Sequence, residues 1–282
     1  MRTGGRTVKC KLQVAAVVLV LFASFSASLL AQTTAGDELD LGAQAFRQAK
    51  YDEAIRHFER CVALAPENTV AHLYLATAYA QEYIPGADTP ENNRMAVQAI
   101  DQYQLVLDGN PVSSARINSV KGIAYLYLQM KKFDDSKKYY RMASDLDPDD
   151  PENYYSIGVI DWTETYVPRQ EERTKLGMEP DEALSAKDKR VCAEMKEKNT
   201  ANVQEGIDNL NKALQLRPDY DDAMAYMNLM YRERADIQCD DLAARSADLQ
   251  TADDWVDKTM ATKKAKAEKA ERSNKPTTTN PQ

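Results

Sequence analysis

Small and bulky hydrophobic residues recur at one fixed spacing in four segments of the chain, and each segment ends at a proline. The prolines are Pro66, Pro111, Pro148 and Pro218. A small residue stands twelve positions before each proline, a bulky residue follows four positions later, and a core-sized residue three positions after that. These three sets are Ala54, Ala99, Ser136 and Gly206; Phe58, Tyr103, Tyr140 and Leu210; and Cys61, Val106, Ala143 and Ala213. Because spacings of four and three share a helical face and proline cannot continue a helix, the pattern predicts four helices that end at these prolines.

A second helical pattern follows each of these prolines. It reads HLYLATAYA from His72, VKGIAYLYL from Val120, YYSIGVIDW from Tyr154 and MAYMNLMY from Met224. Small residues within it, Ala76, Ala124 and Gly158, allow a neighbouring helix to approach closely. The repeating unit is therefore predicted to be a helix pair, which buries its apolar face by stacking on the next pair.

The unit resembles the tetratricopeptide repeat. Leu41 and Gly42 match the Leu-Gly pair of that repeat, and Ala54, Phe58 and Pro66 complete the pattern. Five units are expected, starting near residues 35, 69, 117, 151 and 221. The resemblance implies an all-α fold, a right-handed solenoid of antiparallel helix pairs.

Two insertions interrupt the expected array of residues 35–262, one at about 82–94 and one at about 163–202. Insertions of this kind emerge on one side of a solenoid, so we expect them to build a surface of their own. The array is expected to end in an irregular helix that caps it. The Lys-rich and then Pro/Thr-rich residues 263–282 are predicted to form a disordered tail.

The N-terminus has the composition of a secretory signal. Arg2, Arg6, Lys9 and Lys11 precede an apolar run over residues 14–31. Such a segment is either cleaved, here near Ala31, or kept as a signal anchor in the inner membrane. Residues 1–31 are therefore predicted to export the rest of the chain, as a periplasmic or secreted protein.

The charge of the exported part excludes one class of partner. Residues 1–31 hold four of the 36 Lys and Arg residues and none of the 44 acidic residues, which leaves 32 basic and 44 acidic side chains. A surface with this excess of negative charge repels nucleic acid, so no nucleic-acid partner is expected.

Residues that could support catalysis or metal binding are few. The chain has two histidines, His57 and His72, and both fall at packing positions of the repeat. No metal-binding motif and no phosphate-binding glycine loop is present in the sequence. Cys61 occupies a position that the repeat buries. The sequence therefore predicts a protein that is not an enzyme and that needs no metal and no cofactor.

Three cysteines remain after residue 31, so at most one disulfide can form among them. Cys192 lies in the large insertion and Cys239 at the start of the irregular last helix. In an oxidising compartment these two could join and fix the insertion to the C-terminal cap.

The resemblance implies a binding surface on the concave side, which is lined by the first helix of each pair. The predicted groove residues are Phe46, Leu73, Lys121, Tyr125, Tyr155, Trp162, Leu229 and Arg232. Family members that hold the C-terminal carboxylate of chaperones use asparagines and lysines here, and only Lys121 fits that set. The groove is instead aromatic and apolar, with Tyr125, Tyr155 and Trp162 at its centre.

Two functions are compatible with such a groove. In the first, the chain is a scaffold or adaptor of the cell envelope that binds a protein or peptide segment in the groove. In the second, the groove is filled by the chain's own side chains or by an insertion, since a large exposed apolar surface normally has a cover. The chain would then be an accessory subunit of an envelope enzyme or assembly complex that binds through its insertions.

Overall fold

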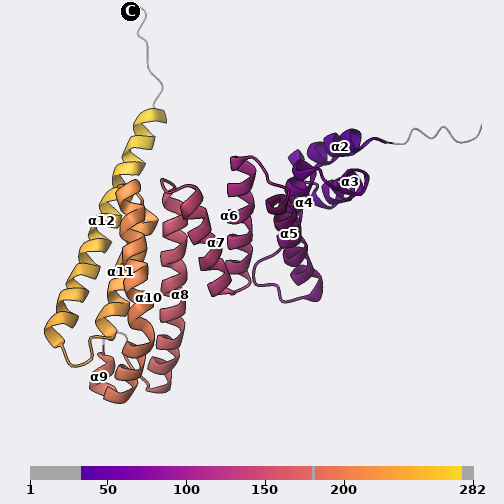
Figure 1. Ribbon diagram of the computed structural model, residues 1–282. Helices are drawn as coiled ribbons and strands as arrows, with labels where there is room; N and C mark the ends of the chain where they lie inside the picture. The colour runs from indigo at the N-terminus through magenta and orange to yellow at the C-terminus, as the bar shows by residue number, and fades with distance from the viewer. Residues whose placement is uncertain (1–32, 180–181, 275–282) are drawn as a thin grey trace, which may run out of the picture.

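The computed structural model describes residues 33–179 and 182–274, and these residues form helices joined by short connections (Figure 1). The helices are α2 (Ala35–Arg47), α3 (Tyr51–Leu64), α4 (Thr69–Glu82), α5 (Pro90–Asp108), α6 (Ser113–Gln129), α7 (Phe133–Leu146), α8 (Pro151–Lys175), α9 (Leu184–Lys187), α10 (Lys189–Leu216), α11 (Asp221–Asp236) and α12 (Leu242–Asn274). None of these helices has the length and apolar character needed to cross a membrane. The predicted signal segment, residues 1–31, lies outside the described residues.

The helices form five pairs that stack in chain order. The pairs are α2 with α3, α4 with α5, α6 with α7, α8 with α10, and α11 with α12, and each pair contacts the next. Figure 1 shows α2–α5 at one end of the array, α6 and α7 in the middle, and the longer helices α8 and α10–α12 at the other end. The predicted all-α solenoid of helix pairs is therefore confirmed.

Helix ends follow local sequence signals. Helix α3 ends at Leu64, α5 at Asp108, α7 at Leu146 and α10 at Leu216, each two or three residues before its proline. At the other ends, side chains accept hydrogen bonds from first-turn N–H groups, and these N-caps are Thr34, Asn68, Thr89, Asp150 and Asp188. Such caps satisfy donors that have no partner within the helix.

The core includes the residues that the repeat pattern identified. All twelve small, bulky and core-sized residues of the pattern are buried. Ser136 is one of them, and its hydroxyl donates a hydrogen bond of 2.8 Å to the carbonyl of Ala124. A Cβ atom added to Gly42 would lie 2.5 Å from the ring of Phe58, so the first helix of the unit needs a residue without a side chain there. The residues of the repeat pattern are therefore those that pack between neighbouring helices.

The first insertion is a compact loop that leads into α5. The side chain of Asn92 accepts from the N–H of Ile84 at 2.7 Å and donates to the carbonyls of Ile84 and Ala87 at 2.8 and 2.7 Å. Asn92 is buried, and its three hydrogen bonds hold the backbone of the loop against the start of α5.

Most of the second insertion is helical and extends its own pair. Helix α8 continues to Lys175 and α10 begins at Lys189, so only residues 176–188, including α9, connect them. Buried charges explain why α8 continues. Arg169 donates to both carboxylate oxygens of Glu233 on α11, at 2.7 and 2.8 Å, and to Asp236 at 2.7 Å. Arg173, one turn later, donates to Asp236 at 3.2 Å.

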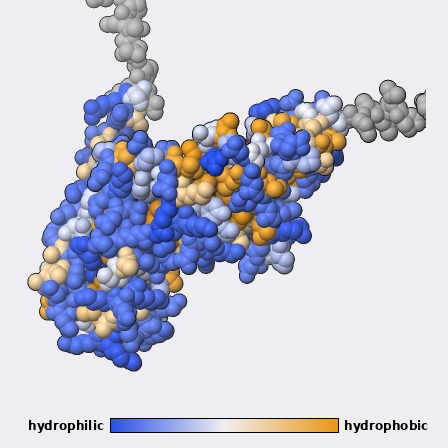
Figure 2. All heavy atoms as spheres, viewed as in Figure 1, coloured by the Kyte–Doolittle hydropathy of each residue, from blue (hydrophilic) through white to orange (hydrophobic). Residues whose placement is uncertain are grey.

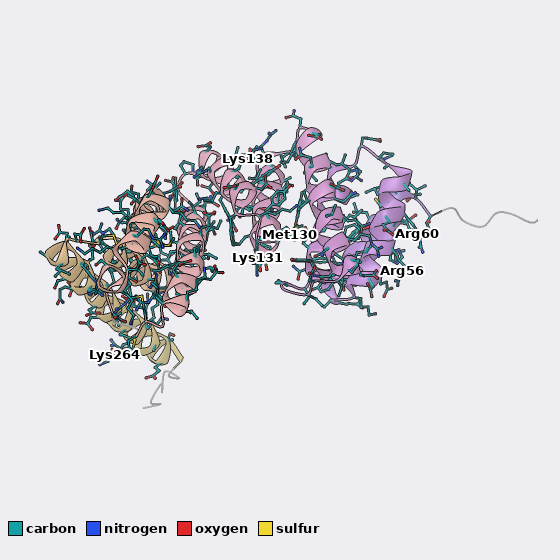
Figure 3. The ribbon with its side chains drawn as sticks, turned by 90° about the horizontal axis from the view of Figure 1, so that it is seen from below. Arg56, Arg60, Met130, Lys131, Lys138 and Lys264 are labelled. Carbon is teal, nitrogen blue, oxygen red and sulfur yellow. A yellow bond between two sulfur atoms is a disulfide. The ribbon has the colours of Figure 1, made fainter. Side chains whose placement is uncertain are left out.

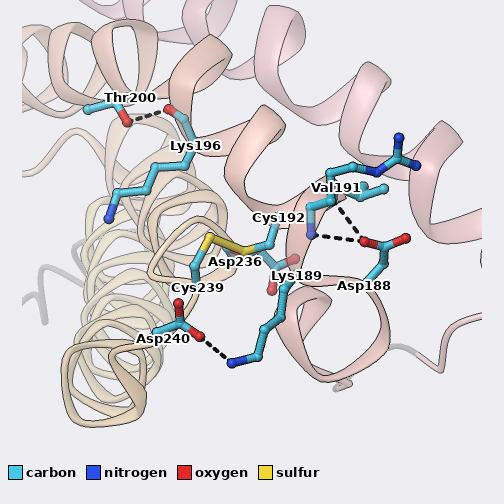
Figure 4. The surroundings of a disulfide bond; sticks show 10 residues. Asp188, Lys189, Val191, Cys192, Lys196, Thr200, Asp236, Cys239 and Asp240 are labelled. Carbon is cyan, nitrogen blue, oxygen red and sulfur yellow. Dashed lines mark hydrogen bonds and ion pairs between the residues drawn. A yellow bond between two sulfur atoms is a disulfide. The ribbon is translucent and has the colours of Figure 1, made fainter.

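A disulfide closes the same end of the molecule. Cys192 near the start of α10 is bonded to Cys239 in the turn between α11 and α12, with Cα atoms 5.7 Å apart (Figure 4). These are the two cysteines that the sequence suggested as partners. Cys61 is free and buried in the N-terminal half.

The prediction of a disordered tail from residue 263 is wrong for residues 263–274. Helix α12 runs to Asn274, and of the predicted tail residues 275–282 lie outside the described part of the chain. This stretch is rich in Lys, Ala and Glu, which are strong helix formers. Lys266 is also paired with Asp221 of α11, which ties the extension to the neighbouring helix.

Replacing one partner of the buried charge cluster should strongly destabilise the C-terminal half. We expect Arg169→Met to lower the free energy of unfolding by about 3 kcal/mol or more, because Glu233 and Asp236 would stay buried without their main cation. Adding Glu233→Met should recover most of that loss. Urea unfolding of the single and the double variant measures the difference. Equal losses of stability in both would show that the buried carboxylates do not depend on Arg169.

Candidate functional site

A groove crosses the first helices of three consecutive pairs, α4, α6 and α8. We call it the tyrosine groove, and its volume is about 610 Å³. It is lined by Thr77, Ala80, Gln81, Tyr83, Tyr103, Lys121, Gly122, Tyr125, Tyr140, Glu152 and Ser156. Four tyrosines therefore meet in one hollow, which is large enough for a few residues of a peptide.

Two of these tyrosines come from second helices and pass between the first helices. Tyr103 belongs to α5 and Tyr140 to α7, and both are bulky core residues of the repeat. Tyr103 reaches the groove because α6 carries a glycine there. A Cβ atom at Gly122 would lie 2.6 Å from the Tyr103 ring. The Tyr103 hydroxyl lies 3.3 Å from that of Thr77.

The groove tyrosines differ in what they offer a ligand. Burial raises the pKa of Tyr83, Tyr103 and Tyr140, so their hydroxyls stay protonated and can both donate and accept hydrogen bonds. The Tyr125 side chain is 44% exposed and presents its ring to solvent. The groove therefore combines neutral hydrogen-bonding groups with one open aromatic surface.

Both charged residues of the groove are already paired. The ammonium of Lys121 lies 2.6 Å from a carboxylate oxygen of Asp150. Glu152 accepts from Arg217 at 2.7 Å and from the Tyr220 hydroxyl at 2.5 Å. The groove thus offers a ligand neither an unpaired cation nor an unpaired carboxylate, which favours an uncharged ligand.

Tyr155 and Trp162 lie in a packed aromatic cluster instead of an open wall. The Tyr155 ring lies 4.9 Å from that of Tyr220 and 5.6 Å from that of Tyr226. Trp162 stacks on Tyr166 at 4.6 Å and meets Tyr226 edge-on at 5.4 Å. Because Tyr226 comes from α11, the next first helix, the C-terminal part of the predicted groove is filled by the chain's own side chains.

The other predicted groove residues lie apart from the tyrosine groove. Phe46 packs edge-on against Tyr51 with ring centroids 5.3 Å apart, and Leu73 packs on the N-terminal core. Leu229 is half-buried on α11, and Arg232 is paired with Asp253 at 2.7 Å. Among the eight predicted residues, the structure brings only Lys121 and Tyr125 together in this groove.

Sequence reasoning missed Tyr83, Tyr103 and Tyr140 as groove residues. Tyr103 and Tyr140 were recognised only as core residues of the repeat. The available signal was Gly122, a residue without a side chain in the first helix that follows Tyr103. On the face shown in Figure 2, hydrophobic residues gather over the half of the molecule that holds α2–α7, whereas the face of α8–α12 is mainly hydrophilic.

Both histidines have structural partners. His57 Nδ1 lies 2.6 Å from Glu38, while His72 contacts Gln102 at 2.6 Å and the carbonyl of Pro66 at 2.7 Å. Within residues 33–179 and 182–274, no group of three or more His, Cys, Asp or Glu residues could hold a metal ion.

Comparisons with known proteins agree with this architecture. The sequence model of the tetratricopeptide repeat matches residues 122–150, which span the end of α6 and all of α7. A crystal structure of MamA protein has a TM-score of 0.54 and 12% identity, over 83% of this chain and 94% of MamA. MamA from residue 41 onward, from Desulfovibrio magneticus RS-1, has a TM-score of 0.54 and 14% identity, over 82% and 96% of the two chains. Among curated proteins, no sequence matches this chain.

The chain thus carries a tetratricopeptide repeat and has the fold of the tetratricopeptide-repeat solenoids. One repeat is recognisable by its sequence, and the likeness to MamA extends the fold over more than four-fifths of the chain. The resemblance that the repeat pattern predicted is therefore confirmed.

Truncating Trp162 should damage stability. We expect Trp162→Ala to lower the free energy of unfolding by about 2–3 kcal/mol, because the indole is packed between Tyr166 and Tyr226. Urea unfolding checks this value. A variant that unfolds like the wild type would mean that Trp162 stands in an open groove.

Proposed function

We propose that this chain is a non-catalytic protein-interaction scaffold whose tyrosine groove binds a neutral peptide segment with an aromatic or apolar side chain. The observation that carries the proposal is the exposed ring of Tyr125 beside three protonated hydroxyls, in a groove whose two charged residues are already paired. A tetratricopeptide-type fold supports the same reading, since the resemblance implies binding on the surface of the first helices.

The energetics of such a groove favour a peptide. An aromatic side chain offers a large contact area and loses little conformational entropy on binding, which is why aromatic residues are frequent at binding hot spots. The hydroxyls of Tyr83, Tyr103 and Tyr140 can meet the alternating N–H and C=O groups of a peptide backbone. A strongly charged segment would lose its hydration in this groove without gaining an unpaired opposite charge.

The proposal places the scaffold in the cell envelope. The support for export is the basic and apolar composition of residues 1–31, together with the Cys192–Cys239 bond. Disulfides persist in oxidising compartments such as the bacterial periplasm and are rare in the cytosol. We propose that the mature chain acts in the periplasm or outside the cell, or at the inner membrane if residues 14–31 remain attached.

A second candidate function uses the large insertion. Its helical extensions of α8 and α10 are held by buried ion pairs and a disulfide, so this region presents a fixed surface. In this alternative the chain is an accessory subunit of an envelope enzyme or assembly complex and binds through that region.

The groove can be tested with a random peptide library displayed on phage. Peptides selected on the full chain should lose about tenfold or more in affinity for Tyr125→Ala, because a hot-spot aromatic contributes about 2 kcal/mol. Thermal unfolding should change little, since Tyr125 is exposed. Fluorescence polarisation of the selected peptides measures the affinity.

Tyr74→Ala is the matched control for this experiment. Tyr74 lies on α4 with a side-chain exposure of 40%, close to the 44% of Tyr125, but it does not line the groove. Its replacement should leave peptide affinity unchanged. Selected peptides that bind wild type and Tyr125→Ala equally well would refute the groove as the binding surface.

Export has a direct test in mass measurement. The protein recovered from the periplasm or medium should have a mass that corresponds to cleavage near Ala31, less two hydrogens for the Cys192–Cys239 bond. A mass that retains Met1 indicates a signal anchor. Three free thiols in the non-reduced protein would contradict both the disulfide and the compartment.

A further inference from the structure

A pocket of about 470 Å³ opens within the large insertion, between α7, α8 and α10. We call it the insertion pocket. It is lined by Lys131, Phe133, Thr163, Glu164, Val167, Pro168, Lys198, Asn199 and Asn202. It shares no lining residue with the tyrosine groove, so the two are separate sites. Its volume falls in the usual range for small-molecule sites, roughly 300–1,000 Å³.

The apolar wall of the pocket is formed by Phe133, Val167 and Pro168. Val167 is 47% exposed although it stands on a helix that is otherwise well packed. Covering an exposed hydrophobic side chain at the mouth of a pocket with an apolar group of a ligand makes the free energy of binding more favourable. One part of the ligand should therefore be hydrocarbon.

Asn199 provides an unpaired hydrogen-bond donor. Its side chain is only 2% exposed, and Nδ2 has no hydrogen-bond partner among the described residues. A buried polar group without a partner costs about 1–3 kcal/mol, so native proteins rarely keep one. A carbonyl or carboxylate oxygen of a ligand would satisfy it.

Pro168 frees an acceptor on the facing helix. Proline has no N–H, so Pro168 cannot give the hydrogen bond that the carbonyl of Glu164 would receive inside α8. Both residues line the pocket. The pocket thus combines a free amide donor with a backbone acceptor that has lost its helical donor, the complement of an amide group in a ligand.

The charge of the pocket is positive. Within the described residues, neither Lys131 nor Lys198 lies within ion-pair distance of a carboxylate, and both are exposed. The carboxylate of Glu164 is already engaged, by Lys137 at 2.7 Å and by Asn202 at 3.3 Å. The two free ammonium groups at the rim therefore favour a ligand with a negative charge.

From these features we infer that the insertion pocket binds an N-acylated apolar amino acid with a free carboxylate. Its side chain would cover Phe133 and Val167, and its amide would meet Asn199 and the Glu164 carbonyl. Its carboxylate would lie near Lys131 and Lys198. The same chemistry occurs in a free small solute and at the carboxyl end of a peptide.

The probe for this site is N-acetyl-L-leucine, titrated into the full chain and followed by amide chemical shifts. Binding should saturate, with shifts around α8 and the start of α7. N-acetyl-L-leucinamide, which lacks the carboxylate, should bind about tenfold more weakly or not at all. Absence of saturable binding, or equal binding of the two compounds, would overturn the assignment.

Lysine variants test the charge. Lys131→Gln with Lys198→Gln should weaken N-acetyl-L-leucine binding about tenfold. The control is Lys138→Gln with Lys196→Gln, which removes the same charge from α7 and α10 without touching the pocket. Figure 3 shows Lys138 on the opposite edge of the molecule from Lys131. If both pairs of substitutions weakened N-acetyl-L-leucine binding equally, the effect would come from net charge alone, and the assignment of Lys131 and Lys198 to the site would be refuted.

The variant Asn199→Leu tests whether Asn199 serves ligand binding or the stability of the fold. If Asn199 serves the ligand, the replacement should abolish binding while the melting temperature stays the same or rises, because an unsatisfied buried donor is removed. A lower melting temperature would assign Asn199 to the fold and contradict the inference. Tyr125→Ala should leave this binding intact, so failure of the tyrosine groove and failure of this pocket are distinguishable.

A longer peptide identifies the source of the ligand. Acetyl-Ser-Gly-Ser-Gly-Leu carries the same terminal carboxylate on an extended chain. Affinity similar to that of N-acetyl-L-leucine would indicate that the site accepts the end of a protein chain. Exclusion of the peptide would restrict the site to small solutes.

Discussion

The array depends on one packing constraint, the close approach of a bulky side chain to a glycine on a neighbouring helix. Phe58 fills the space over Gly42, and Leu210 fills the space over Gly158. Because protein interiors are packed as densely as organic crystals, such contacts fix the distance between helices. These two contacts lie within pairs. The same kind of contact joins successive pairs, because Tyr103 of α5 lies against Gly122 of α6 and Met230 of α11 lies against Gly206 of α10, and a solenoid results.

The same constraint creates the tyrosine groove. At Gly122 the bulky residue is a tyrosine, so the contact that packs α5 against α6 also brings a hydroxyl to the surface of the first helices. A phenylalanine there would pack equally well and would offer no hydrogen bond. Tyr103 therefore has two roles. Its ring packs between α5 and α6, and its hydroxyl lines the groove.

In the C-terminal half the surface of the first helices is filled, and ion pairs and a disulfide hold the helices together. Its first helix α8 carries Tyr155 and Trp162, which pack against Tyr226 of α11 and so close the surface that is open around Tyr125. The Arg169–Glu233 ion pair and the Cys192–Cys239 bond hold the long helices together. Burying those charges is costly without complete pairing, and the bidentate geometry of Arg169 supplies it. The insertion pocket lies beside α8 and α10 of this half.

The helix pairs, their ends at the four prolines and many of their core residues could be predicted from the sequence, because helical period and proline are local properties. It also suggested the Cys192–Cys239 pairing. It could not decide how far α8 extends, since that depends on Arg169 meeting Glu233, 64 positions away. It could not separate open from filled groove surface, because Tyr125 and Trp162 occupy equivalent helix faces and differ only in what the next first helix places against them. These points became clear in the folded chain, since each depends on contacts between residues that are distant along the sequence.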